Sequence, residues 1–190
     1  MVPSTGLSEV TSDWDCLKRA RQGDDSAWRE LFGRHQASLL NMATLITGSP
    51  DSAQDVIQES FLQLLKNRGE NSAGSFRAYV AKIAYHLALK ERARRSHRSS
   101  LQNLDVSDGN PSALEAAIRD DRQREVAGAI GSLAEDQRRI LILRFYGEFS
   151  YEHIAEITRI PLGTVKSRIF YAVKACRERL LMKGLDHETL

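Results

Sequence analysis

Residues 149–180 read FSYEHIAEITRIPLGTVKSRIFYAVKACRERL and contain two helical patterns separated by a short turn. Ser150 can cap the first, short helix, and the second, longer helix opens near Gly163, after a turn that includes Pro161. Ala155 is a small residue, as is required where two helices cross at close range. This spacing predicts a helix-turn-helix.

The second helix of this motif has an apolar side and a polar side. Ile160 and Val165 are expected to bury the apolar side of the turn and of the helix. An ordinary amphipathic hairpin with solvated Lys and Arg is the alternative, but the small Ala155, the short turn and the polar side occur together and favour DNA binding. The polar side would face a major groove and its phosphates. The predicted contacts are Thr164, Lys166, Ser167, Arg168, Phe170, Tyr171, Lys174 and Arg177.

The net charge of +2 conceals a separation of charge along the chain. Residues 77–98 contain seven Lys or Arg and one Glu, and residues 159–183 contain the same numbers. Residues 1–60 contain nine Asp or Glu against five Lys or Arg. Two basic segments and an acidic N-terminal part indicate two contacts with a polyanion and a contact with a different partner elsewhere.

Apolar residues recur at spacings of three and four, which predicts an all-α protein. The expected helices are 13–22, 26–46, 50–67, 75–96, 113–132, 135–146, 151–158 and 162–182. The polar stretch SSLQNLDVSDGNPS contains Asp-Gly and Asn-Pro and predicts a boundary between two small helical domains. The predicted division is a flexible tail at 1–12, a first domain at 13–98, a flexible linker at 99–112, a second domain with the helix-turn-helix at 113–183, and a flexible tail at 184–190.

Composition narrows the class of protein. With 42% hydrophobic and 27% charged residues, no apolar run long enough for a bilayer and no signal-peptide pattern, the sequence predicts a cytoplasmic protein without membrane insertion. Cys16 and Cys176 lie far apart, and the five histidines lack metal-ligand spacing. No nucleophile elbow or phosphate-cradling glycine loop is present. We therefore predict no enzyme activity, no metal and no cofactor.

Three segments carry a family resemblance. LRFYGEFSYEHIAEI and PLGTVKSR, within residues 133–181, closely resemble region 4 of the extracytoplasmic-function (group 4) sigma factors of bacterial RNA polymerase. DSAQDVIQESFLQLLK resembles region 2.2 of the same family, and SFRAYVAKIAYHLALKERARR resembles its regions 2.3 and 2.4. The resemblance covers about residues 13–181, with the regions in the family's order.

The resemblance implies a function in transcription initiation. A protein of this family binds core RNA polymerase, through the β′ clamp helices and the β flap, and recognises minus-10 and minus-35 promoter elements in duplex and single-stranded DNA. An anti-sigma factor commonly holds it inactive. The region 2.2 helix is the implied core-binding surface, with Asp55, Gln58, Glu59, Leu62 and Gln63. Like charges four residues apart on a helix repel each other, as in this acidic helix, and a basic partner would relieve that repulsion.

The minus-10 element is read in this family by region 2, which captures unpaired bases by stacking and hydrogen bonding. Tyr79 also fits the apolar stripe of its helix, so both a core position and a base contact stay open for it. The matching residues are Asn71, Ser72, Tyr79, Lys82, Tyr85, His86, Lys90, Arg94 and Arg95.

Five positions depart from the family pattern. His86 and Lys90 stand where Asn and Asp are common, and Tyr171 and Val173 replace frequent arginines. Arg159 occupies a turn position usually held by Gly, where positive φ is often needed. The promoter bases that this chain prefers therefore cannot be assigned from other members of the family.

A two-domain helix-turn-helix regulator that binds operator DNA without polymerase is the alternative function. Such a protein has no need for a second basic helix, and the alternating strands and helices of a receiver domain are missing from the sequence.

Overall fold

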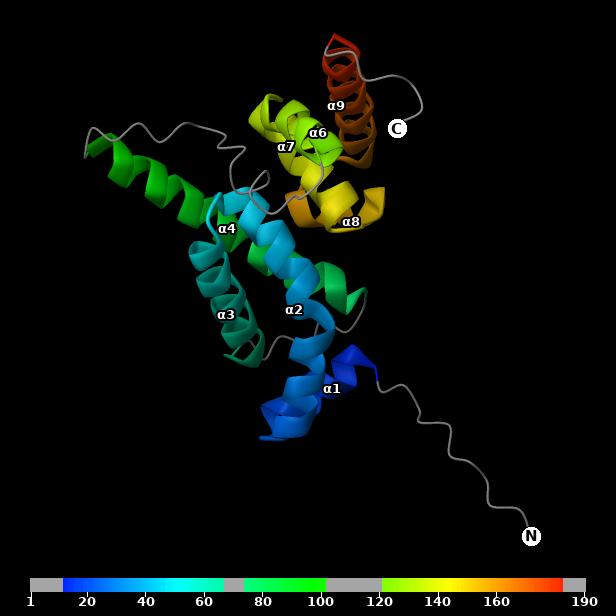
Figure 1. The fold of residues 1–190 in the computed structure, drawn as a ribbon. Helices are drawn as coiled ribbons and strands as arrows, with labels where there is room; N and C mark the ends of the chain where they lie inside the picture. Colours follow the sequence, from blue (N-terminus) through cyan, green and yellow to red (C-terminus); the bar gives the residue numbers. More distant parts are fainter. Residues whose placement is uncertain (1–11, 67–73, 102–120, 183–190) are drawn as a thin grey trace.

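The computed structural model describes residues 12–66, 74–101 and 121–182, and all regular structure in these ranges is helical. Figure 1 shows the helices in two groups. The first group contains α1 (Asp13–Arg21), α2 (Asp25–Thr47), α3 (Pro50–Lys66) and α4 (Phe76–Leu101). The second contains α6 (Asp121–Gly131), α7 (Glu135–Leu141), the π-helix η1 (Ile142–Tyr146), α8 (Tyr151–Thr158) and α9 (Leu162–Met182). The predicted all-α fold of two small helical domains is confirmed.

Aromatic and branched apolar residues build the core of the first group. Phe61 of α3 is 1% exposed and packs edge-on against Phe32 and Trp28 of α2, with ring centroids 4.8 and 5.6 Å apart. Leu31, Leu39 and Met42 extend this contact along α2, at spacings that keep one face of the helix toward α3 and α4. Burial of this apolar face accounts for the packing of the three long helices.

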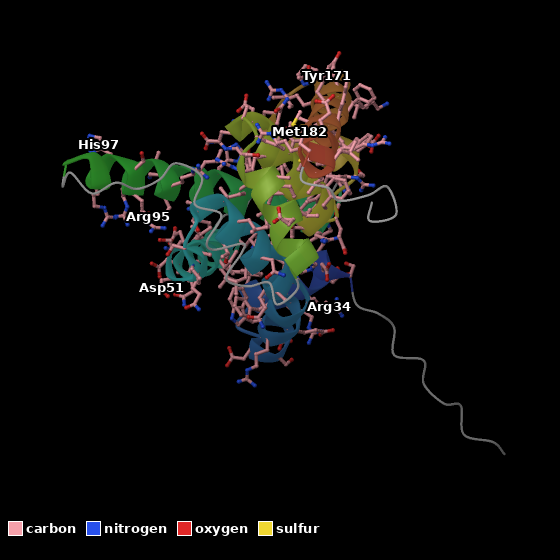
Figure 2. The ribbon with its side chains drawn as sticks, turned by 45° about the horizontal axis from the view of Figure 1, so that its top comes forward. Arg34, Asp51, Arg95, His97, Tyr171 and Met182 are labelled. Carbon is pink, nitrogen blue, oxygen red and sulfur yellow. The ribbon has the colours of Figure 1, made fainter. Side chains whose placement is uncertain are left out.

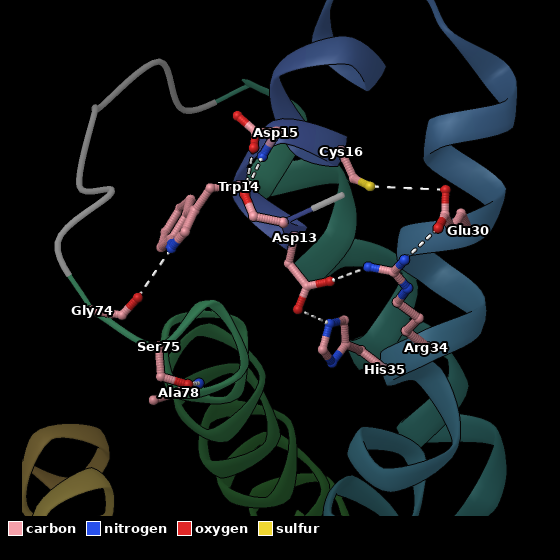
Figure 3. A network of polar contacts seen from close by, with 11 residues as sticks. Asp13, Trp14, Asp15, Cys16, Glu30, Arg34, His35, Gly74, Ser75 and Ala78 are labelled. Atoms are coloured by element: carbon pink, nitrogen blue, oxygen red, sulfur yellow. Dashed lines mark hydrogen bonds and ion pairs between the residues drawn. The ribbon is translucent and has the colours of Figure 1, made fainter. Parts of the chain in front are cut away.

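A polar network ties α1 to α2 and to the start of α4 (Figure 3). The Asp13 carboxylate accepts from Arg34 at 2.8 Å and lies 2.9 Å from Nε2 of the nearly buried His35. The Trp14 indole N–H donates to the carbonyl of Gly74 at 3.0 Å. These contacts fix the position from which α4 begins.

Asp24 caps α2 and supplies a test of the fold. Its carboxylate accepts from the hydroxyl of Ser26 at 2.6 Å, from the backbone N–H of Ala27 at 3.1 Å and from Arg19 at 2.6 Å. These donors, Ser26 first, hold the pKa of Asp24 well below the ordinary value for an aspartate. Because the pKa is lower in the folded than in the unfolded chain, this stabilisation is present at pH values above about 4 and is lost as the pH falls.

We expect Asp24→Asn to lower the free energy of unfolding at pH 7, and the deficit relative to the wild-type chain to shrink as the pH falls from 5 to 2. Urea denaturation across this pH range measures the deficit. A deficit that is constant with pH would show that the charge of Asp24 contributes nothing to stability.

The second group contains Phe149, which is 1% exposed and belongs to the same buried core as Leu143 of η1 and Ile154 of α8. Gly147 lies directly against this ring. A Cβ atom at Gly147 would lie 2.6 Å from Cδ2 of Phe149 and 2.8 Å from the carbonyl oxygen of Leu143. Only glycine therefore allows the chain to turn from η1 toward α8 in this way.

Most predicted helices have the bounds that the sequence indicates, and α8 and α9 match them at both ends. α4 differs, because it continues to Leu101 where the prediction ended it at Ser96. Residues 92–101 contain neither Gly nor Pro, and Glu91 forms ion pairs with Arg94 and Arg98 at 2.9 and 3.9 Å. The predicted tails at 1–11 and 184–190, residues 102–112 of the linker, and residues 113–120 lie outside the described residues. Within the described ranges, no helix has the length and apolarity needed to cross a bilayer.

Candidate promoter DNA interface

The predicted helix-turn-helix is formed by α8 and α9. The hydroxyl of Ser150 accepts from the backbone N–H of His153 at 3.2 Å, which caps α8 as the sequence indicates. Ile154 and Ile157 of α8 and Val165 of α9 are fully buried where the two helices meet. The shared core therefore fixes the angle at which α9 is presented to solvent.

The solvent side of α9 carries an aromatic pair. Phe170 and Tyr171 are 64% and 59% exposed, and their rings pack edge-on with centroids 5.4 Å apart. Figure 2 shows Tyr171 pointing outward from this helix. Of the predicted contacts on α9, Lys166, Ser167, Phe170, Tyr171, Lys174 and Arg177 are exposed.

The two remaining predicted contacts on α9 are half-buried. Thr164 lies in the first turn, and its carbonyl accepts from the hydroxyl of Ser167 at 3.1 Å. Arg168 pairs with Asp136 of α7 at 3.2 Å and so points along the domain surface rather than away from it. In this arrangement Arg168 holds α9 against α7, and contact with a phosphate would require that ion pair to open.

Arg159 has the positive φ that its position in the turn predicts, with φ 59° and ψ 35° at the C-terminal end of α8. This conformation destabilises a residue that has a Cβ by roughly 1 kcal/mol.

We expect Arg159→Gly to raise the free energy of unfolding by about 0.5 kcal/mol, because glycine relieves the strain but loses more backbone entropy on folding.

The matched control is Gln22→Gly, which places glycine at the C-terminal end of α1, where φ is −92°. This variant has no strain to relieve and should be destabilised. Chemical denaturation of both variants measures the difference, and equal destabilisation of the two would refute strain at Arg159.

α4 presents a second basic surface. Of the residues predicted to contact the minus-10 element, His86, Lys90 and Arg94 are exposed. Nδ1 of His86 lies 2.6 Å from the carbonyl of Lys82, and Arg94 pairs with Glu91 at 2.9 Å. The C-terminal part of α4 projects beyond the other helices, with His97 on it (Figures 1 and 2).

Three other residues predicted for the minus-10 element do not lie on this surface. Tyr79 is half-buried and packs on Trp14, with ring centroids 5.5 Å apart, so in the free chain it contacts the core. Tyr85 is 6% exposed, and burial raises the pKa of its hydroxyl. Arg95 donates to the carbonyl of Thr47 at 3.1 Å. Lys82 is half-buried, and Asn71 and Ser72 lie outside the described residues.

The role of Arg95 is shared with Arg92, which was not predicted. Arg92 donates to the carbonyl of Ile46 at 3.1 Å, so the two side chains satisfy the last carbonyls of α2. The sequence gives no signal for this contact, because donors and acceptors lie more than forty residues apart.

α3 presents the predicted core-binding residues together. Leu62 is 44% exposed and stands among the exposed Asp55, Gln58 and Glu59. The Gln63 amide donates to the Glu59 carboxylate at 3.0 Å. An exposed apolar residue with acidic and amide groups nearby on the same helix resembles the apolar centre and polar rim of a protein-binding site.

The two helical groups and the helix-turn-helix define a DNA-binding protein. The family model of Sigma-70 region 2 matches residues 31–98, and that of Sigma-70, region 4 matches residues 123–176. The chain is 30% identical over 186 residues to the ECF RNA polymerase sigma-E factor of Escherichia coli (strain K12), covering 89% of this chain and 94% of the relative. It is 29% identical over 180 residues to the RNA polymerase sigma-H factor of Pseudomonas aeruginosa, covering 88% and 93%.

The chain belongs to the extracytoplasmic-function sigma factors. This membership confirms the predicted function, which is to direct promoter-specific transcription initiation, and does not favour the polymerase-independent regulator.

Several solved structures share the fold, and two of them are given as examples. One is CnrH in complex with the cytosolic domain of CnrY, with a TM-score of 0.64 and 20% identity over 92% of this chain and 99% of that chain. The other is the sigma factor RpoE in complex with the anti-sigma factor NepR from Bartonella quintana, with a TM-score of 0.63 and 20% identity over 80% and 96%.

Proposed function

We propose that this sigma factor uses three of its helices for three separate contacts. α3 binds core RNA polymerase, α4 engages the minus-10 element and α9 reads the minus-35 element. The helix-turn-helix is the observation that carries the proposal. Its second helix, α9, buries one side in the domain and exposes on the other side polar, basic and aromatic side chains, which suit contacts with bases and phosphates. The two DNA-binding domains would be 13–98 and 113–183, and of the proposed linker 99–112 the first three residues continue α4, which ends at Leu101.

The proposed partners follow from the family. They are the β′ clamp helices and the β flap of core polymerase, promoter DNA and, as in the RpoE structure, an anti-sigma factor. The chain would act in the cytoplasm, where its DNA template and the polymerase are found. The polymerase would perform the chemistry of RNA synthesis, and the chain would supply binding energy and position.

On α9, the cations and the aromatic pair have different tasks. Lys166 and Lys174 are exposed and suit phosphates, which fix the position of the helix without reading sequence. Tyr171 stands where the family commonly has an arginine, and neither Phe170 nor Tyr171 carries the positive charge that would form an ion pair with a phosphate. Their rings can instead pack against the C5-methyl groups of thymine in the major groove.

We therefore expect a thymine in the preferred minus-35 element opposite Phe170. Replacement of that thymidine by deoxyuridine removes one methyl group and should weaken holoenzyme binding about fourfold, the value of one buried methyl group. The measurement uses a promoter duplex selected from random DNA by the holoenzyme. In a Phe170→Ala holoenzyme the same replacement should have no effect. Equal binding of thymidine and deoxyuridine duplexes by the wild-type holoenzyme would refute the proposed contact.

On α4, the exposed cations suit the backbone of the separated strand. Lys90 and Arg94 can contact its phosphates, while His86 offers a ring for stacking or an edge for hydrogen bonding. Binding to the unpaired strand but not to the duplex shifts the equilibrium toward the open promoter.

A pull-down with core RNA polymerase tests the proposed function against the alternative. The chain should bind core polymerase tightly and promoter duplex poorly until that complex forms. Tight binding of the free chain as a dimer to a palindromic duplex, with no polymerase association, would refute it.

A further inference from the structure

The exposed basic surface of α4 contains one side chain that can accept a hydrogen bond. His86, Lys90 and Arg94 are exposed and stand four residues apart, so they follow one another along one side of the helix. Lysine and arginine carry hydrogen-bond donors and no acceptor, whereas a neutral imidazole carries one donor and one acceptor. Of these three side chains, His86 is therefore the one that can accept from a base.

Two contacts hold the imidazole ring of His86 in place. Nδ1 lies 2.6 Å from the carbonyl oxygen of Lys82, one turn earlier in α4. The ring also packs edge-on against Tyr85, with ring centroids 5.5 Å apart and an angle of 89° between the ring planes. Because Tyr85 is itself buried, this contact restrains the plane of the His86 ring.

The contact with Lys82 determines which nitrogen of the neutral ring carries the proton. A carbonyl oxygen can only accept, so at 2.6 Å Nδ1–H must be the donor. The oxygen has two lone pairs and can accept this bond together with the helical N–H of residue 86. The neutral ring then has a lone pair and no hydrogen at Nε2. Among the described residues no group donates to Nε2, so this acceptor is available to a ligand.

The four bases differ in the exocyclic group that such an acceptor would meet. Adenine and cytosine carry an amine, which donates, whereas guanine and thymine carry a carbonyl oxygen, which accepts. An acceptor without a hydrogen can bond to the amine but is repelled by the carbonyl oxygen. The ring N–H of guanine or thymine is a poorer donor to this site, because the adjacent carbonyl places its lone pairs near that of Nε2. In a separated strand, no opposite base occupies these groups.

We propose that His86 determines base specificity in the separated strand: Nε2 accepts from the exocyclic amine of one unpaired base and so selects adenine or cytosine over guanine or thymine. The proposal rests on the proposed function, which assigns the separated minus-10 strand to α4. Lys90 and Arg94, in the same row, contact the phosphates and carry no base preference. The ring of His86 acts through its edge and not as a stacking surface.

The tautomer of His86 can be tested without DNA. In a chain that contains isotope-labelled histidine, nitrogen–proton correlation spectra distinguish a neutral ring protonated at Nδ1 from one protonated at Nε2. The His86→Phe variant assigns the signals by removing them. In alkaline buffer, where imidazole rings are neutral, we expect His86 to carry its proton on Nδ1. A proton on Nε2 would overturn the proposal, because that nitrogen would then be a donor, and would leave the proposed function standing.

The base preference is measured with holoenzyme and a promoter library randomised across the minus-10 element. At one position the wild-type chain should favour adenine and cytosine over guanine and thymine about fivefold, the value of one hydrogen bond. His86→Phe keeps an aromatic ring at an exposed site but removes the acceptor, so it should abolish this preference alone. The matched control is His97→Phe, the same change at another exposed position of α4, which should leave every preference unchanged.

Removal of the amine tests the same hydrogen bond from the DNA. At the position that His86→Phe changes, the selected base is replaced by the same base without its exocyclic amine, such as purine in place of adenine. Wild-type holoenzyme should bind this promoter about fivefold more weakly than the unmodified one. Holoenzyme with the His86→Phe chain should bind the two promoters equally.

Two further results would overturn the proposal. One is a preference for guanine or thymine, or no changed preference at all, when His86→Phe is compared with the wild-type chain. The other is equal binding of the promoters with and without the amine by wild-type holoenzyme. A wild-type chain that selects no promoter with core polymerase would instead refute the proposed function, while the spectra of the free chain would still decide whether Nε2 is an acceptor.

Discussion

Leu62→Asp is expected to weaken binding to core RNA polymerase by about 30-fold or more, which corresponds to roughly 2 kcal/mol. Leu62 is 44% exposed at the centre of the polar face of α3. An exposed leucine contributes little to the stability of the free chain. Its burial at an interface removes apolar surface from water and therefore stabilises the complex. Asp would remove this apolar surface and would bring an unpaired charge into the interface.

The fold should tolerate this change, because position 62 faces solvent in the free chain. Ala37→Asp, at an exposed site of α2, introduces the same side chain away from α3 and should leave the affinity for core polymerase unchanged. Surface plasmon resonance with immobilised core enzyme measures both affinities, and urea denaturation checks the fold. Wild-type affinity in a folded Leu62→Asp chain would exclude α3 as the docking helix.

Gly147→Ala is expected to lower the free energy of unfolding by about 2 kcal/mol, in the range for overpacking a closely packed site. The added Cβ would lie 2.6 and 2.7 Å from two ring carbons of Phe149 and 2.8 Å from a backbone oxygen. Because the ring is 1% exposed and the oxygen belongs to η1, neither can move without disturbing the core of the second group.

Gly33→Ala is the matched control for this prediction. A Cβ at Gly33 would meet no atom within 4 Å, and the residue lies in the middle of α2. Alanine there should stabilise the chain by about 0.5 to 1 kcal/mol, because it favours the helix and restricts the unfolded chain. Thermal and urea denaturation compare the two variants. If Gly147→Ala is as stable as the wild-type chain, Phe149 is not the fixed centre of this domain.

The helix-turn-helix could be predicted from the sequence because its determinants are local. Ser150 caps α8, the apolar residues of α9 recur at helical spacing, and the positive φ of Arg159 belongs to a turn between two recognisable helices. The exposed face of α3 was also predictable, since the period of its apolar residues assigns Asp55, Glu59 and Leu62 to the solvent side.

The side chains of α4 were harder to assign, because their partners lie far away in the sequence. Arg77 lies in a basic segment of the sequence, and nothing there indicates that its guanidinium contacts Gly147 and Phe149 of the second helical group. Tyr85 and Arg95 carry the chemistry of nucleic-acid contacts, yet one is buried against α7 and the other completes the end of α2. Contacts between groups far apart in the chain leave no periodic signal in the sequence.

The central claim, that this chain directs polymerase to promoters through two separate DNA contacts, is tested most directly by transcription from a genomic DNA library with mapped RNA 5′ ends. Core polymerase with the purified chain should yield discrete start sites that share two upstream sequence elements, whereas core polymerase alone should not. Start sites that are the same with and without the chain would contradict the account.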